Sequence, residues 1–261
     1  MKLRVTRSLV PNFFTLLNLF MGFNAIIAAS NNKFTNVAIF ILAASIFDML
    51  DGVMARLIHS TSEFGAELDS LCDLVSFGVA PGFMLYNLYL NQLAEIGIVL
   101  SSLPALAGAV RLARFNVQLT SFEDKNFFTG LPIPSSALTL ISYIVFIHPL
   151  ECIPLEYKPI LLIAITIIAS SSMVSTIKFD NMPRPTKKSF NQRPVVSIIF
   201  YIAVIASIVS QGVSIFPFMV FYIVASSLRH FFFSIKATRE ASDELDDSQE
   251  LEPNAFDDLD L

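Results

Sequence analysis

The sequence predicts an all-α protein, a polytopic transmembrane bundle of about eight helices. Of its 261 residues, 54% are hydrophobic and 25 are Phe. Only 15% are charged, whereas soluble domains carry about 25% charged residues. Apolar stretches long enough to cross a bilayer as helices recur along the chain. Their approximate bounds are 12–30, 34–58, 69–90, 93–113, 132–150, 157–177, 194–211 and 213–235.

Four of these helices need separate justification. The first follows a basic N-terminus, but its apolar run is long for a signal peptide and contains several Asn residues, so we expect it to be retained. The fifth opens at Gly130-Leu131-Pro132-Ile133-Pro134, where proline is tolerated because it begins a helix. The last two are divided only by a very short connection around Gln211-Gly212.

The distribution of bases predicts the orientation. An even number of helices puts both termini on one side, together with the connections 56–68, 111–130 and 176–193. That side carries 15 of the 17 Lys and Arg residues, and only Lys33 and Lys158 lie opposite. The positive-inside rule makes it the cytoplasmic side. We therefore expect a multi-pass membrane protein with both termini in the cytoplasm, in the inner membrane if the cell is bacterial.

The acidic end of the chain is set apart by composition. Residues 240–261 hold ten acids and no base, and only scattered apolar residues. Such a segment is expected to be disordered and solvated. We expect one membrane domain over residues 1–239, followed by this tail.

Four carboxylates stand inside apolar segments. Asp48 and Asp51 are three residues apart and Asp69 and Asp73 are four apart, so each pair shares a helix face. A carboxylate at membrane depth is costly and is functional by default unless a partner is evident. Four of them on two adjacent helices predict a site for divalent cations that prefer oxygen ligands. That site would face the cytoplasm.

The neighbouring residues suggest a phosphate ligand. Gly52 and Gly65 have no side chains and would let a bulky ligand approach the backbone. Arg56 could hold phosphate with its guanidinium fork. Metal ions beside an arginine suit a pyrophosphate. Two alternatives stay open: a set of buried ion pairs, for which the helices offer few bases, and a cation pathway through a transporter.

These spacings carry a family resemblance. The pattern Asp48-x-x-Asp51-Gly52-x-x-Ala55-Arg56, eight residues, Gly65, three residues, Asp69, three residues, Asp73 resembles the complete signature of the CDP-alcohol phosphatidyltransferases. The resemblance implies a helical membrane enzyme that moves a phosphatidyl group from CDP-diacylglycerol to an alcohol and releases CMP. It also implies a two-metal site with Mg²⁺ or Mn²⁺, and a homodimer.

The resemblance also assigns roles by position. Asp48, Asp51, Asp69 and Asp73 would bind the metals, and Asp73 would also be the general base. His59, near the end of the second helix, is the next candidate for the base from its position alone. Residues expected to contact the cytidine diphosphate are Asn12, Thr15, Gly52, Arg56 and Ser62. For Asn12 and Thr15 a plain helix cap is an alternative that can coexist with this role.

Residues outside the signature bear on the alcohol. Five segments are similar to the membrane-embedded phosphatidylserine synthases of this family, which implies L-serine: 17–23, 67–81, 111–117, 130–134 and 173–175. Arg111 and Arg114 share a helix face and could bind the serine carboxylate, and Asn116 could add hydrogen bonds. The arginines could equally be membrane anchors, or could bind glycerol 3-phosphate or an inositol phosphate. A sister enzyme acting on one of these or on choline is therefore the nearer alternative. We expect membrane lipids as partners and no nucleic acid.

Overall fold

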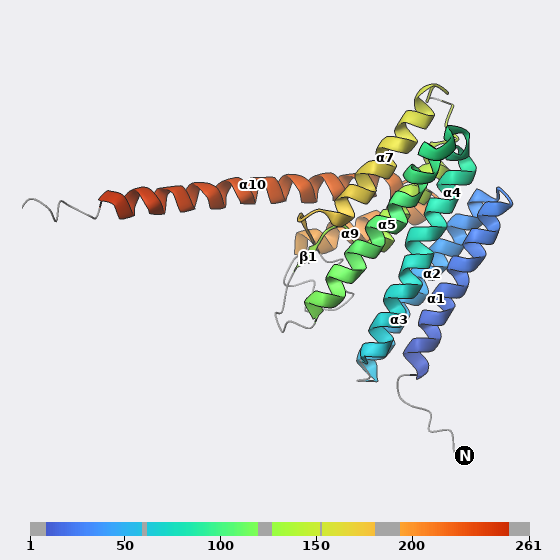
Figure 1. Ribbon diagram of the computed structural model, residues 1–261, viewed down its shortest axis with the longest axis horizontal. Coiled ribbons are helices and arrows are strands. Elements are labelled where there is room, and N and C mark those ends of the chain that lie inside the picture. The colour runs from blue at the N-terminus through green and yellow to red at the C-terminus, as the bar shows by residue number, and fades with distance from the viewer. Residues whose placement is uncertain (1–8, 59–61, 120–126, 152, 181–193, 251–261) are drawn as a thin grey trace, which may run out of the picture.

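The computed structural model describes residues 9–58, 62–119, 127–151, 153–180 and 194–250. Nearly all of them are helical (Figure 1). In chain order the elements are α1 (Leu9–Ser30), α2 (Phe34–Leu57), α3 (Glu63–Asp73), the π-helix η1 (Leu74–Val79), α4 (Ala80–Leu88), the 3₁₀ turn η2 (Leu90–Leu93), α5 (Ala94–Leu119), β1 (Phe127–Thr129), α6 (Ile133–Ser142), the π-helix η3 (Tyr143–Ile147), α7 (Tyr157–Val174), β2 (Lys178–Asp180), α9 (Pro194–Val209) and α10 (Ile215–Glu250).

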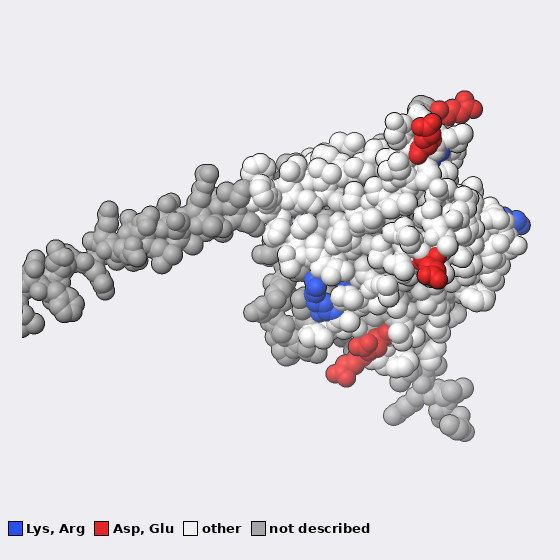
Figure 2. Space-filling view, turned by 45° about the horizontal axis from the view of Figure 1, so that its top comes forward, with Lys and Arg blue, Asp and Glu red and all other residues white. Residues whose placement is uncertain are grey.

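The predicted polytopic helical bundle is confirmed. In the described residues, six helical segments are long and apolar enough to cross a membrane: Leu9–Ser30, Phe34–Leu57, Glu63–Leu88, Leu90–Val117, Tyr157–Val174 and Ile215–Phe233. Two shorter apolar helices, Ile133–Ile147 and Ile198–Val209, fall on the remaining two predicted spans. The described surface in Figure 2 is almost uncharged, with acids and bases as isolated groups. The chain is a multi-pass membrane protein.

Helices α1 and α2 form a tight hairpin because small side chains line their contact. Ala25, Ala28 and Ala29 of α1 are buried, as are Ala38 and Ala44 of α2. Small residues let helix backbones approach closely, which is how helices gain packing energy inside a membrane. The hairpin places the C-terminal half of α2, with its two aspartates, beside the start of α1 (Figure 1).

The third span is continuous from α3 through η1 to α4. The wider turn of η1 begins directly after Asp73 and ends before Pro81, and wide turns of this kind often occur at functional sites. Helix α1 lies against it at Gly22, where an added Cβ would sit 2.7 Å from the Cα of Ser76. Only glycine permits such a close contact between the two backbones. This contact holds the polar face of α1 against α3.

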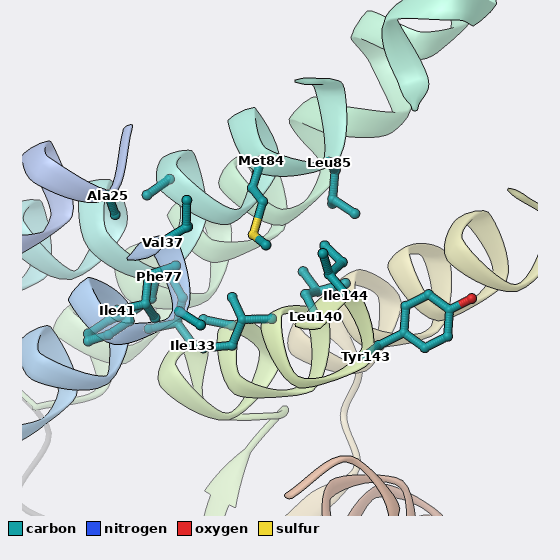
Figure 3. Close-up of a cluster of buried hydrophobic side chains, with 14 of the residues drawn as sticks. Ala25, Val37, Ile41, Phe77, Met84, Leu85, Ile133, Leu140, Tyr143 and Ile144 are labelled. Atoms are coloured by element: carbon teal, nitrogen blue, oxygen red, sulfur yellow. The ribbon is translucent and has the colours of Figure 1, made fainter. Parts of the chain in front are cut away.

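The core is built around α6, a short helix that packs against α2, α4, α5, α7 and α10. Because other helices surround α6, its side chains are apolar or small on every side. Ile133 and Leu140 of α6 and Ile144 of η3 belong to one buried hydrophobic cluster. In Figure 3, Ile133 lies near Ile41 of α2 and Phe77 of η1, whereas Leu140 and Ile144 lie on the side of Leu85 of α4. This central helix ties the hairpin to the rest of the bundle.

Two features differ from the sequence expectation or extend it. Strands β1 and β2 pair antiparallel, with Phe128 opposite Phe179, so the predicted connections 111–130 and 176–193 join in a short ribbon. Helix α10 runs at a steep angle to α1 and α2 and continues to Glu250, eleven residues into the segment expected to be a disordered tail (Figure 1). Residues 251–261 lie outside the described part, and the domain boundary at 239/240 stays a prediction.

Candidate active site

Helices α2 and α3 bring three of the four carboxylates together. One oxygen each from Asp48, Asp51 and Asp69 lies within 4.8 Å of the others. Asp51 is buried, and Asp48 and Asp69 are half-buried. The arrangement follows from helix geometry, since each side chain projects from a turn that faces the neighbouring helix. This group of three acidic side chains could hold a metal ion.

Asp73 lies beside this group but is turned toward α1. Its carboxylate interacts electrostatically with Asp48, Asp69 and Asp51, while its Oδ1 accepts a hydrogen bond of 2.9 Å from Asn18 Nδ2. Asp73 is only 7% exposed. The fourth carboxylate is thus held in one orientation by an amide of the first helix.

Asn18 is a site residue to which the sequence analysis gave no role. Its backbone oxygen also accepts a hydrogen bond of 3.0 Å from Ser76 Oγ, so it ties α1 to η1 while its side chain holds Asp73. A signal was available: Thr15 and Asn18 are spaced three apart within an apolar helix, and both are buried. Only the packing of α1 on α3 shows which acid Asn18 meets.

Thr15 also contacts an acid. Its hydroxyl donates to Asp51 Oδ2 at 2.9 Å and lies 3.2 Å from the carbonyl oxygen of Pro11. Because α1 already begins at Leu9, Thr15 stands in the second turn and does not cap the helix in the described residues. Its observed contact orients Asp51, which leaves the expected nucleotide contact as a prediction.

Two other residues expected to contact the nucleotide, Asn12 and Ser62, meet at the start of α3. Ser62 caps this helix and accepts a hydrogen bond of 3.0 Å from the backbone N–H of Gly65. A Cβ on Gly65 would lie 3.1 Å from Ser62 Oγ and 3.4 Å from Asn12 Oδ1. On α2, the exposed Arg56 folds back along its own helix, so that its Nη1 lies 3.6 Å from the position of a Cβ on Gly52. His59 lies outside the described residues.

The two arginines of α5 have different surroundings. Arg111 is 8% exposed and interacts electrostatically with Asp73 and Tyr222. Arg114 is half-buried, and its Nη1 donates to the carbonyl oxygen of Val174 at 3.0 Å, where α7 ends. Arg111 is therefore at the carboxylates, whereas Arg114 joins the ends of α5 and α7.

Asn116 lies further along α5. Its Oδ1 accepts a hydrogen bond of 3.2 Å from Ser70 Oγ of α3. It thus contacts the residue next to Asp69, on the helix that carries two of the acids.

The donor set fits a hard divalent cation. All three grouped side chains are carboxylates, which Mg²⁺ and Mn²⁺ prefer. Oδ1 of Asp69 is buried and has no hydrogen-bond partner among the described residues. A buried, unsatisfied carboxylate oxygen is costly, and a cation would compensate it.

Comparison with known protein families agrees with the spacing and the geometry of the four aspartates. The model of the CDP-alcohol phosphatidyltransferases matches residues 8–176. The chain belongs to this family. The matched residues run from α1 to the end of α7 and include all four aspartates of the CDP-alcohol phosphatidyltransferase signature.

Several curated members of the family that are named CDP-diacylglycerol–serine O-phosphatidyltransferase are similar over two thirds or more of the chain. That of Helicobacter pylori is 31% identical over 228 residues, which is 87% of this chain and 93% of that protein. That of Methanocaldococcus jannaschii is 38% identical over 174 residues (67% and 75%). That of Bacillus subtilis is 33% identical over 175 residues (67% and 92%). No solved structure matches the chain.

Proposed function

We propose that this protein transfers a phosphatidyl group from CDP-diacylglycerol to the hydroxyl of L-serine and releases CMP. The observation that carries the proposal is the convergence of Asp48, Asp51 and Asp69 beside a separately held Asp73. The serine preference is supported by the names of the relatives and by the buried Arg111 next to Asp73.

The carboxylates would hold two divalent cations, Mg²⁺ or Mn²⁺. Asp48, Asp51 and Asp69 supply clustered oxygens, and Asp73 would contribute from its position beside them. Bound there, the cations would neutralise the pyrophosphate and the charge that develops on the departing CMP. Thr15 supports this arrangement because its hydroxyl fixes one oxygen of Asp51.

The protein's own groups would carry the proton transfer. Asp73 takes the proton of the serine hydroxyl, whose oxygen then forms a bond to the β-phosphorus as the bond from that phosphorus to CMP breaks. Asn18 keeps Asp73 pointing in one direction during this step. A carboxylate held by a neighbouring amide loses little orientation entropy when the substrate arrives.

The remaining residues would select the two substrates. Arg111 would bind the serine carboxylate through a charge-assisted hydrogen bond, while Arg114 and Asn116 keep the end of α5 against α7 and α3. The cytidine diphosphate would lie over the start of α3 and the end of α2. The residues proposed to contact it are Asn12, Thr15, Gly52, Arg56 and Ser62.

The placement in the membrane is part of the proposal. The concentration of bases at one end supports a cytoplasmic active site and cytoplasmic termini. CDP-diacylglycerol would then enter from the cytoplasmic leaflet with its acyl chains in lipid. The proposed homodimer rests on the family resemblance alone.

A CMP-release assay tests the function. Purified full-length protein is given CDP-diacylglycerol, Mg²⁺ or Mn²⁺, and one of L-serine, glycerol 3-phosphate, inositol, inositol phosphate or choline. We expect release with L-serine and little with the others. Release with another alcohol would identify a sister transferase. Metal flux into liposomes without any CMP release would identify a transporter and overturn the proposal.

A further inference from the structure

A second polar site lies at the end of the bundle opposite the carboxylates. A cavity of about 540 Å³ lies between the N-terminus of α2, the residues after η3 and the start of α7. Phe34 lines it and begins the helix that carries Asp48 fourteen residues later. At 1.5 Å per residue the cavity is roughly 20 Å from the acids.

Two lysines from distant parts of the chain converge on this cavity. Lys33 precedes α2 and Lys158 lies in the first turn of α7, and both line the cavity together with His148. They are the two bases that the sequence places on the side opposite all the others. None of the described residues that line the cavity is acidic. Like charges gathered in one cavity repel one another, and a bound anion would remove that cost.

Other groups in the cavity add hydrogen-bond donors. Phe34, Thr35 and Asn36 form the first turn of α2, and the N-cap residue Lys33 provides no side-chain cap. The N–H groups of such a turn lack intrahelical partners and favour an anion. Burial and the charge of Lys158 lower the pKa of His148 below its usual value. The ring is therefore neutral at pH 7 and can donate one hydrogen bond.

The deeper wall of the cavity is apolar. Leu88, Ile144 and Val145 line it, and Ile144 is 3% exposed. A basic rim beside an apolar wall matches an amphipathic anion. We propose that this cavity binds a phosphate group, presented by an anionic phospholipid of the leaflet opposite the active site. A free phosphate ion would meet the same donors, so the two sources need to be distinguished.

The chain contains no Trp, which offers a local reporter. Phe34→Trp places a single indole in the cavity wall. The full-length variant is reconstituted in phosphatidylcholine nanodiscs that contain increasing fractions of a brominated lipid. This lipid is either brominated phosphatidylglycerol or brominated phosphatidylcholine, and the bromine atoms on its acyl chains quench Trp fluorescence. We expect half-maximal quenching at a fraction of brominated phosphatidylglycerol that is roughly 10-fold lower than the fraction of brominated phosphatidylcholine needed for the same effect. This difference corresponds to one charge-assisted contact. Inorganic phosphate is titrated separately, and the Trp emission is recorded.

Charge variants in the same background locate the effect. Lys33→Gln with Lys158→Gln should abolish the preference for phosphatidylglycerol, whereas Lys33→Arg with Lys158→Arg should keep it. CMP release equal to that of the Phe34→Trp parent shows that a variant is folded. Each single Gln variant, and His148→Gln, should weaken the preference on its own, so the test stands even if the double variant does not fold.

The outcomes decide between the sources. Selective quenching by the brominated anionic lipid identifies a lipid phosphate. A saturable emission change with phosphate alone, lost in the lysine variants, identifies a free ion at the same site. Equal quenching by both lipids without a response to phosphate would overturn the proposal, and so would a preference that survives the Gln substitutions. Because CMP release is measured independently, failure here leaves the proposed transferase activity untouched.

Discussion

Asp73 occupies a different environment from the grouped Asp48, Asp51 and Asp69, which predicts different losses on substitution. Asn in place of Asp48, Asp51 or Asp69 removes a charge from the grouped oxygens and should nearly abolish CMP release, because the transition state depends on electrostatic stabilisation. Asp73→Asn should lower the single-turnover rate by at least roughly 10²-fold while weakening nucleotide binding far less than Asp69→Asn does. Single-turnover CMP formation and nucleotide binding are measured on all four variants. A near-normal rate in Asp73→Asn would move the base elsewhere, with His59 next to test.

The hydrogen bond from Asn18 to Asp73 gives a second prediction at this scale. Asn18→Leu keeps the size of the side chain but removes the donor at 2.9 Å from Asp73 Oδ1. Losing a hydrogen bond to a charged group costs about 1.5–3 kcal/mol, so we expect kcat to fall roughly 10-fold or more. The KM for CDP-diacylglycerol should change little. Asn24→Leu is the matched control, since that amide donates to the carbonyl oxygen of Phe20 in its own helix and has no other hydrogen-bond acceptor among the described residues. Equal effects of the two changes would refute a positioning role.

The two arginines of α5 should behave differently. Arg111→Gln should raise the KM for L-serine far more than the KM for CDP-diacylglycerol, because Arg111 lies next to Asp73. Arg114→Gln loses a bond to the backbone of Val174 and should mainly lower the Tm. Steady-state kinetics in both substrates and thermal unfolding of the two variants separate these effects. An unaltered dependence on L-serine in Arg111→Gln would exclude Arg111 from the serine site.

At the scale of elements, the contact of α1 with η1 holds the site together. A Cβ at residue 22 would lie 2.7 Å from the Cα of Ser76, which is backbone and cannot turn aside. Gly22→Ala should therefore separate the two helices, at a cost of about 1–3 kcal/mol typical of overpacking. We expect a lower Tm and a loss of kcat, because Asn18 moves with α1. Phe23→Ala, a change at the adjacent lipid-facing position that is 56% exposed, is the control and should leave kcat unchanged.

For the whole molecule, the testable property is its placement in the membrane. Asn31 lies in the exposed turn between α1 and α2, and the exposed Glu63 begins α3 at the other end of the bundle. With Cys152 replaced by Ser, Asn31→Cys should react with a membrane-impermeant maleimide in intact cells. Glu63→Cys should react only after permeabilisation, because the positive-inside rule places the base-rich end in the cytoplasm. The reverse pattern would invert the proposed orientation. The buried Cys72 serves as the unlabelled background.

The composition of the chain and the spacing of its residues were sufficient to predict a bundle of membrane-spanning helices and the helix faces that carry the aspartates. In lipid every backbone polar group must be satisfied within its own segment, so long apolar runs have to be helices and their number can be read from the chain. The pairs Asp48/Asp51 and Asp69/Asp73 could be placed on helix faces for the same reason, since helical periodicity is a local property. The family signature added the chemistry expected of those faces.

Contacts between helices could be decided only by the tertiary structure. Nothing in the order of residues indicates that Asn18 meets Asp73, that Arg114 bonds to Val174, or that Lys33 and Lys158 share a cavity. The short ribbon of β1 and β2 was likewise missed, because its pairing joins connections about fifty residues apart. Such contacts depend on how helices rotate and approach one another, and that geometry is set by small residues such as Gly22 and by close packing around α6. Local periodicity determines which residues share a face, and only packing determines what each face meets.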